Sequence, residues 1–549
     1  MHSSLIFTAL VGILARIVSA DENGDALKPT PTATISNGTI IGTTTSIPGP
    51  TSAIPVNKFL GIPYAAKAVR FSPPQPHAAW TTALNTQKYG NACMQAFPPV
   101  ALRPFTESVF SDDPKPNEDE DCLFINVYAP KKQWDPNNPF PVMYWIYGGA
   151  WKFGDTSQRW YDGSHFAALE DVVVVSVNYR TNAFGFPISP SVPLNQRNLG
   201  MLDQRFGLQW VQDNIRHFGG DPDKVTVFGE SAGGFATDAL VTSNAPNFHA
   251  AIMESGVYAY LLAGPCDNNN FNAWNALVQA LNCSSGDQTA QFNCVKNDRT
   301  QQQIKDAQEA GNGITFGFAC DEVTLVSNPR TRLENGQTKN IPVILGSNTA
   351  DGSLYSWTTF ANNNTTAYVN ARLSGNRTIQ AGIERVYPIP QPGGPDNATI
   401  LGSVDTDWFF HCPGYWYGLT STKSKPTWRY IFNAEFKNTR ARVPSGWTWP
   451  EQYQRAWHSS EIPIVFTSYD APTAESTQNT LSNTMRHAWG YFARNHAPPS
   501  ELNWPQVGKG SGGKDVIEFG TDKKAGVSIV EDVDHCDFWE SMGFKNFHA

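Results

Sequence analysis

The chain has little that would suit it to a membrane or to nucleic acid. Beyond residue 20, no apolar run approaches the ~20 residues of a membrane-spanning helix, and the C-terminus lacks the hydrophobic tail of a lipid-anchor signal. Lysine and arginine total 40 against 49 aspartates and glutamates, so the formal net charge is −9. No basic cluster reverses this balance locally. We therefore expect neither a nucleic-acid partner nor stable membrane association.

Patterns typical of metal sites are also missing. No cysteine and histidine cluster has the spacing of zinc ligands. We expect neither a metal nor a cofactor. The sequence gives no indication of the oligomeric state.

The first twenty residues have the pattern of a secretory signal peptide. An apolar run from Leu5 to Val18 leads into Val18-Ser-Ala20, a small-residue cleavage site. Residues 21–34 are polar and rich in proline and threonine, which predicts a disordered leader. In the oxidising environment that secretion implies, the even number of eight cysteines favours disulfides. Six sequons would then be glycosylation acceptors, at Asn37, Asn282, Asn363, Asn364, Asn376 and Asn397.

Residues 35–549 contain no linker or repeat and are expected to form one domain. Ile35–Thr45 and Phe59–Tyr64 are β-rich and punctuated by glycine, as in an antiparallel edge. Pro141–Tyr147 and Val172–Val177 are continuous apolar runs, typical of strands buried on both faces of a parallel sheet.

Further short apolar strands alternate with helical patterns toward the C-terminus. This alternation predicts an α/β fold with a mostly parallel central sheet and helices on both faces. Residues 260–340 and 355–425 lack the alternation and are predicted to be helical insertions. We expect them above the carboxyl ends of the strands, where such folds bind ligands.

Ser231 lies in the pattern of a catalytic serine. The apolar strand Val225–Phe228 runs directly into Gly229-Glu-Ser231-Ala-Gly233, and small residues able to begin a helix follow. A G-x-S-x-G motif in this strand–turn–helix context is a nucleophile elbow. The tight turn needs small flanking residues, and the helix N-terminus favours negative charge beside the serine. Ser231 is therefore the predicted nucleophile of acyl transfer.

An acyl-transfer site also needs backbone N–H groups that point at the developing oxyanion. The N–H of Ala232, directly after the nucleophile, is one candidate. The loop Tyr147-Gly-Gly149-Ala150-Trp151, which follows the apolar strand at residues 141–147, is the expected source of the others.

Besides the elbow, ordered motifs occur along nearly the whole mature chain, at Phe59–Ala65, Glu120–Val127, Asn178–Arg180, Asn198–Arg205, Phe218–Pro222 and His535–Trp539. Together they resemble the type B carboxylesterase/lipase family, the cholinesterase-like α/β-hydrolases, and in style the secreted fungal members. The resemblance implies an α/β-hydrolase fold, a small-molecule carboxylic ester as substrate, and oxyanion donors at Gly149, Ala150 and Ala232. It also implies the disulfides Cys93–Cys122, Cys283–Cys294 and Cys412–Cys536. A bond between Cys266 and Cys320 is possible, but the resemblance does not imply it.

His458 is the predicted general base. In this fold the acid follows the nucleophile and the histidine follows the acid. Among the six later histidines, His458 lies in a loop between the predicted strand Trp428–Phe436 and an amphipathic C-terminal helix. The segment Ala456–Pro463 also resembles the family's histidine motif. The imidazole would take the serine proton and return it to the leaving alcohol.

Asp351 is the predicted acid. It follows the strand Pro342–Leu345 and aligns with the family's acid, which is usually glutamate. Aspartate can orient an imidazolium equally well, but its side chain is one methylene shorter, so the loop must come closer. The resemblance further suggests a helper serine in Glu254–Val257, at the position that Val257 occupies. The alternative is that Asp351 is only a turn residue and another carboxylate serves.

Glu230 and Glu461 match acidic positions of the family and are predicted to act electrostatically near the imidazole, or else to be structural carboxylates.

Three other functions remain as alternatives. A non-catalytic adhesion protein is disfavoured because the chain retains Ser231, Asp351 and His458. A cholinesterase would need an aromatic cage for a quaternary ammonium, and no single residue marks one. An interfacial lipase would need an apolar lid, whereas the loop between Cys93 and Cys122 is rich in proline and acidic residues. Short-chain or aryl esters are the expected substrates.

Overall fold

The fold is described from a computed structural model. It describes residues 30–97, 103–260, 267–310, 314–360, 375–387, 397–447, 449–509, 514–532 and 535–544. The predicted signal peptide, most of the predicted leader, and the sequons at Asn363 and Asn364 lie outside these ranges.

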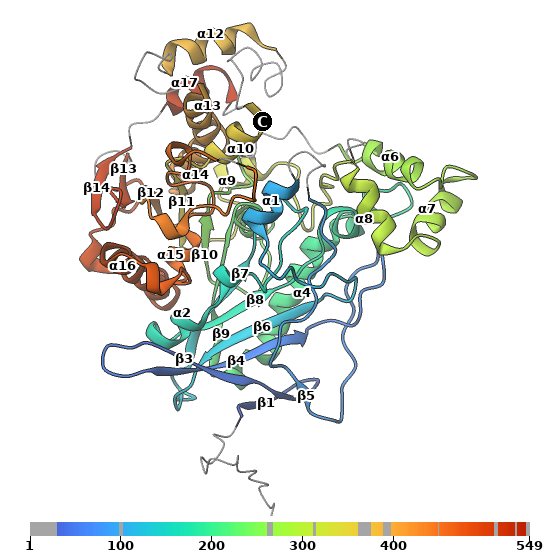
Figure 1. Ribbon diagram of the computed structural model, residues 1–549, viewed down its shortest axis with the longest axis horizontal. Helices are drawn as coiled ribbons and strands as arrows, with labels where there is room; N and C mark the ends of the chain where they lie inside the picture. The colour runs from blue at the N-terminus through green and yellow to red at the C-terminus, as the bar shows by residue number, and fades with distance from the viewer. Residues whose placement is uncertain are drawn as a thin grey trace, which may run out of the picture.

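An 11-stranded sheet forms the centre of the molecule, in the order β14-β13-β12-β11-β10-β9-β7-β8-β6-β4-β3 (Figure 1). The strands β8, β7, β9, β10, β11, β12 and β13 run parallel to one another. At one end, β3, β4 and β6 form an antiparallel N-terminal edge, and at the other β14 pairs antiparallel with β13. The predicted fold class is thereby confirmed. The strands are β1 (Thr32–Ile35), β2 (Gly38–Ile41), β3 (Thr43–Ile47), β4 (Ile54–Pro63), β5 (Leu84–Asn85), β6 (Phe124–Pro130), β7 (Phe140–Ile146), β8 (Val173–Val177), β9 (Gly220–Glu230), β10 (Ala250–Glu254), β11 (Val343–Asn348), β12 (Thr427–Phe432), β13 (Asp515–Phe519) and β14 (Val527–Glu531).

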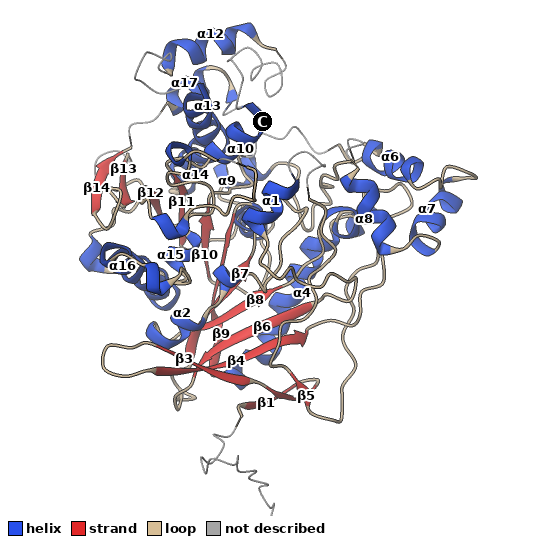
Figure 2. Cartoon of the chain, in the orientation of Figure 1, coloured by secondary structure: helices blue, strands red, loops and turns tan. Residues whose placement is uncertain are grey.

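Helices cover both faces of this sheet (Figure 2). Successive side chains of a strand point to opposite faces, and β7 illustrates the consequence. Tyr144 donates its hydroxyl to the Gln204 carbonyl in α4, 2.9 Å away, while the ring of Trp145 packs 5.0 Å from that of Phe466 beside α15. Both layers therefore bury the same strand, which explains its uninterrupted apolar sequence. The helices are α1 (Arg103–Phe110), α2 (Ser164–Leu169), α3 (Asn182–Gly185), α4 (Leu199–Asn214), α5 (Ala232–Thr242), α6 (Asn272–Ala280), α7 (Gln288–Asn297), α8 (Gln301–Glu309), α9 (Pro329–Glu334), α10 (Ser353–Phe360), α12 (Arg377–Val386), α13 (Asn397–Asp405), α14 (Cys412–Ser421), α15 (Ile462–Val465), α16 (Ser476–Asn495) and α17 (Cys536–Ser541).

Two groups of helices lie within the ranges expected to be insertions. Helices α6–α8 and α9 fall in residues 260–340, and α6–α8 form a separate bulge at the right of Figure 1. Trp274, Leu277 and Ile304 of this bulge form a small apolar core together with Phe71 and Phe184 of the main body. Helices α10 and α12–α14 fall in residues 355–425 or at their border and lie at the top of the figure.

The predicted boundary of the leader was wrong. Strand β1 begins at Thr32, inside the range 21–34 that composition assigned to a disordered segment. Ala33 and Ile35 alternate with exposed threonines and are buried, and β1 pairs antiparallel with β2. Burial of one face is enough to order this short strand despite its polar composition.

The three disulfides that the family resemblance implies are present. They join Cys93 to Cys122, Cys283 to Cys294 and Cys412 to Cys536. Cys320 is also disulfide-bonded, whereas Cys266 lies outside the described residues.

Candidate active site

Ser231 occupies a strained turn between β9 and α5. Its backbone has φ 55° and ψ −121°, a conformation that costs a residue with a Cβ about 1–3 kcal/mol and that clusters at functional sites. Hydrogen bonds fix it on both sides, from the Ser231 N–H to the Glu254 carbonyl (2.8 Å) and from the Phe235 N–H to the Ser231 carbonyl (2.9 Å). A Cβ at Gly233 would lie 1.9 Å from the Ile146 carbonyl oxygen, so only glycine permits this close approach. The serine is partly exposed although its neighbours are buried.

The glycine-rich loop after β7 lies directly beside this turn. A Cβ added at Gly148 would come within 3.0 Å of Ser231 Cβ. Gly149, Ala150 and Trp151 follow with φ of 105°, 53° and 56°, three successive left-handed residues. Among the described residues, the N–H groups of Gly149, Ala150 and Ala232 donate no hydrogen bond. N–H groups that are held in place without an acceptor can stabilise a negatively charged oxygen.

Asp351 and His458 form a buried pair. The Nδ1 of His458 lies 2.8 Å from Asp351 Oδ1, to which it donates, although the residues are 107 positions apart. The shorter acid reaches the ring because the two loops are joined directly, by a bond from the Ala350 N–H to the Ala456 carbonyl (3.0 Å). Since Oδ1 fixes the Nδ1 proton, the other ring nitrogen is left to act as a base.

The helper hydroxyl comes from Ser255. The expectation that the helper position is the one occupied by Val257 was wrong. Ser255 Oγ donates to Asp351 Oδ2 at 2.9 Å, and the Asn348 N–H donates to the same oxygen at 2.8 Å. Ser255 directly follows β10, which pairs with β11, and β11 leads into the Asp351 loop. The Asp351 carboxylate is thus fully buried but fully hydrogen-bonded, as a buried charge must be.

The second ring nitrogen, Nε2 of His458, faces the residue that precedes the nucleophile. It lies 3.2 Å from Glu230 Oε1. Within the described part of the chain, Nε2 has no hydrogen-bond partner, and none of the hydrogen bonds joins Ser231 to His458. The imidazole and the serine turn are therefore neighbours without a closed Ser–His contact. Such contacts are often long without substrate and tighten in the complex.

The charges around His458 favour its protonated form. Burial alone would lower the pKa of His458, but the carboxylates of Glu230 and Asp351 outweigh it and raise the pKa above its usual value. Burial also raises the pKa of Glu230, against the opposing effects of the imidazole and of a hydrogen bond from Ser459 Oγ (2.7 Å). Glu230 is thus positioned to stabilise an imidazolium.

Two more carboxylates are buried behind this pair. Burial, together with Glu230, Asp351 and Glu254, raises the pKa of Glu461 far above its usual range, and Glu461 Oε2 accepts a bond from Asn348 Nδ2. Burial raises the pKa of Glu254 to about 8, although Trp489 Nε1 donates to its Oε1 at 2.7 Å. Glu254 was not predicted, because nothing in its local sequence indicates that Trp489, 235 positions later, contacts it.

Two aromatic rings contact the imidazole. The Phe410 ring lies 4.7 Å and the Tyr355 ring 5.5 Å from that of His458. Phe410 belongs to a π-helical turn, Thr406–His411, and Thr406 Oγ1 accepts the Gly352 N–H beside the acid (2.8 Å). Both contacts were missed, because the sequence between 355 and 425 carries no periodic signal that would place one residue against His458.

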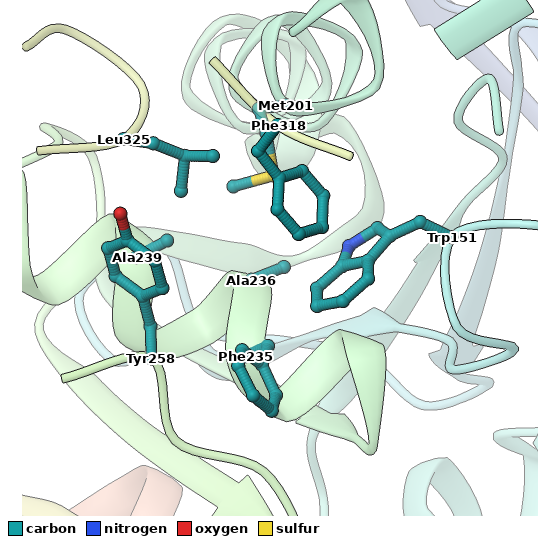
Figure 3. Close-up of a pocket in the computed structure, with 8 residues that line it drawn as sticks. All are labelled: Trp151, Met201, Phe235, Ala236, Ala239, Tyr258, Phe318 and Leu325. Atoms are coloured by element: carbon teal, nitrogen blue, oxygen red, sulfur yellow. The ribbon is translucent and has the colours of Figure 1, made fainter. Parts of the chain in front are cut away.

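An apolar pocket adjoins the serine turn and the glycine-rich loop. Figure 3 shows Trp151, which follows Ala150, and Phe235, in the first turn of α5, on its walls. Phe318 completes an edge-to-face contact with Trp151, 4.4 Å between ring centroids. The free volume of the pocket is ≈ 10 Å³, about the space of one water molecule, and its lining is apolar. An apolar substrate group would enter this pocket only by displacing some of these side chains.

The loop between Cys93 and Cys122 contains a short amphipathic helix that its proline content did not predict. Phe105 and Val109 of α1 are buried. The Phe105 ring packs 5.8 Å from Trp447 and 5.7 Å from Trp449. This loop therefore does present an apolar face, although a small one.

Neither a metal-binding cluster nor a membrane-spanning helix occurs among the described residues. No group of three or more histidine, cysteine, aspartate or glutamate side chains is arranged to hold a metal ion. No helix within the described ranges is both long and apolar enough to cross a bilayer.

Comparison with known proteins gives a consistent assignment. The sequence model of the carboxylesterase family matches residues 29–539. The para-nitrobenzyl esterase of Bacillus subtilis is 32% identical over 473 residues, covering 82% of this chain and 88% of that protein. Secreted lipase 5 of Gibberella zeae is 26% identical over 502 residues, covering 85% and 87%. A solved PNB esterase structure superposes with a TM-score of 0.72 at 27% identity, covering 94% of this chain and 100% of that one.

Proposed function

Because this chain belongs to the carboxylesterase family and is a carboxylic ester hydrolase, we propose that it works through an acyl-enzyme on Ser231, with His458 as base and Asp351 as orienting acid. The observation that carries this proposal is the buried 2.8 Å contact of His458 Nδ1 with Asp351 Oδ1. The opposite ring nitrogen of this pair lies beside Glu230, the residue next to Ser231.

In the first half-reaction, His458 Nε2 takes the proton of Ser231 Oγ as that oxygen attacks the ester carbonyl. The N–H groups of Gly149, Ala150 and Ala232 stabilise the oxyanion. The intermediate collapses to the acyl-enzyme, and His458 returns the proton to the leaving alcohol. Water repeats the sequence in the second half and releases the carboxylic acid. Asp351 and Glu230 stabilise the imidazolium that forms in each half.

Labelling with a fluorophosphonate tests this proposal and separates it from a non-catalytic adhesion protein. We expect one adduct, on the peptide that contains Ser231, with parallel loss of p-nitrophenyl ester hydrolysis. Ser231→Ala should abolish both. A wild-type protein that neither takes the label nor hydrolyses esters would contradict the proposal.

We further propose that the protein is a secreted, glycosylated single-domain enzyme whose first 20 residues are removed. The N-terminal pattern, the disulfides and the fungal relative named a secreted lipase support this. N-terminal sequencing of protein from the medium of a eukaryotic host should begin at Asp21. Retention of the protein inside the cells would contradict it.

An interfacial lipase is the second candidate, favoured by the apolar face of α1 and by the fungal lipase relative. The free volume of the apolar pocket, ≈ 10 Å³, instead disfavours long acyl chains. A panel of p-nitrophenyl esters from acetate to palmitate, with and without an emulsion, separates the two. We expect the highest kcat/KM for short chains and no jump in rate at the interface.

A further inference from the structure

Lys152 is a partly buried cation without a partner, in the loop proposed to supply the oxyanion donors. Among the described residues its ammonium group makes no hydrogen bond or ion pair. Burial lowers the pKa of Lys152, and no carboxylate opposes this effect. Lysine is seldom withdrawn from water unless something pairs with it.

The backbone of Lys152 is held in place on both sides. Its N–H donates to the Gly149 carbonyl at 2.9 Å, which closes a tight turn, and its own carbonyl accepts from the Ala96 N–H at 2.8 Å and from Thr181 Oγ1 at 3.2 Å. Such a turn keeps its first and last Cα within about 7 Å. A lysine stem carries the ammonium about 6 Å from its Cα. The ammonium is therefore tethered within about 13 Å of the Cα of Gly149, one of the proposed oxyanion donors.

The surroundings of the active site make this charge selective. Asp351, Glu230, Glu254 and Glu461 are buried on the imidazole side, where they disfavour a second negative charge. Lys152 places a positive charge in the loop after β7. An anionic substituent of the substrate would therefore be attracted toward this loop rather than toward the imidazole.

We propose that Lys152 is a specificity-determining residue that binds a carboxylate of the substrate, so that the enzyme favours esters carrying a negative charge near the scissile bond. Hemiesters of dicarboxylic acids, or esters of hydroxy acids, have this chemistry. The inference rests on the proposed function, because it concerns the same site.

Two pairs of esters test it and show which half of the substrate carries the charge. p-Nitrophenyl hemiglutarate against p-nitrophenyl butyrate places the carboxylate in the acyl part. 4-Carboxyphenyl butyrate against phenyl butyrate places it in the alcohol part. The readout is the ratio of kcat/KM for the charged and neutral member of each pair, with kcat and KM determined separately.

In the wild type, at least one ratio should fall as salt is added, because an ion pair at a partly exposed site is screened. Lys152→Met should lower that ratio about tenfold, mainly through KM, as expected for loss of a charge-assisted hydrogen bond, and should remove its salt dependence. Lys152→Arg should keep most of the ratio. Lys88→Met, which removes an exposed lysine near β5, is the matched control and should leave the ratio within about twofold.

Equal ratios in the wild type and in Lys152→Met, for both pairs, would overturn the inference, provided that the variant unfolds at the wild-type temperature. The neutral esters would still be hydrolysed in that case, and the proposed function would stand. Loss of all ester hydrolysis by the wild type would instead remove the proposed function itself.

Discussion

Replacing Glu230 with glutamine is expected to extend activity to lower pH. The neutral imidazole of His458 is the proposed base, so activity is lost on the acid side as the imidazole takes up a proton. The Glu230 carboxylate stabilises that protonated form and raises the pKa of His458. The amide keeps the shape of the side chain without the charge. The pKa of His458 falls, and the acid limb of kcat/KM moves to lower pH.

The size of this shift follows from the 3.2 Å between Glu230 Oε1 and His458 Nε2. Unit charges at this separation interact by about 5 kcal/mol at an effective dielectric of about 20, which is an upper limit. Burial raises the pKa of Glu230 itself, so the two groups share protons over the same range and the full charge does not act. We therefore expect a shift of about one to two pH units.

The assay is kcat/KM for p-nitrophenyl butyrate over roughly pH 4 to 9, read at the isosbestic wavelength of nitrophenol. Glu254→Gln is the matched control, a second buried carboxylate of the same cluster. Burial raises the pKa of Glu254 to about 8, so its side chain is already neutral along the acid limb, and the amide should not move that limb. An unchanged acid limb in Glu230→Gln, or equal shifts in both variants, would mean that the charge of Glu230 does not raise the pKa of His458.

Three further substitutions probe the same framework. Asp351→Asn should lower kcat about 10⁴-fold in ester hydrolysis with little change in melting temperature, because the amide favours the wrong imidazole tautomer; near-normal turnover would mean that another carboxylate serves. Gly233→Ala should cost at least about 3 kcal/mol by overpacking, because its Cβ would lie 1.9 Å from a carbonyl oxygen of β7, whereas Gly317→Ala, with nothing within 4 Å, should be neutral by thermal unfolding; similar melting points for the two would contradict this packing. Replacing Cys412 and Cys536 together by serine should cost about 4 kcal/mol in denaturant unfolding, because this bond spans 124 residues, and an unchanged midpoint would show that it does not restrain the unfolded chain.

Strands buried on both faces could be predicted from the sequence, whereas the two strands at the C-terminal edge of the sheet could not. The apolar run of β7 has a single physical explanation, because both faces pack against helices. The edge strand β14 is half-exposed along its length, and polar residues interrupt the apolar ones in its partner β13. Neither strand carries a long apolar run, and both were missed. Strand β6 entered the prediction only as part of a family motif.

In the candidate site, too, features that depend on local sequence could be predicted, and features that depend on tertiary packing could not. Ser231 could be predicted because the strand–turn–helix context is local. The hydroxyl that contacts Asp351 could not, since the choice between Ser255 and position 257 depends on how β10 lies against the Asp351 loop. The contact of Phe410 with His458 likewise depends on the π-helical turn and on tertiary packing.

The proposed mechanism requires that Ser231, the loop after β7 and His458 converge on one reacting carbon. A crystal structure of the enzyme with a phosphonate ester bound covalently would show whether they do. We expect an adduct on Ser231, with its phosphoryl oxygen about 2.7–3.1 Å from the backbone nitrogens of Gly149, Ala150 and Ala232, and with His458 Nε2 within hydrogen-bonding distance of Ser231 Oγ. An adduct on another residue, or a phosphoryl oxygen pointing away from those nitrogens, would contradict it.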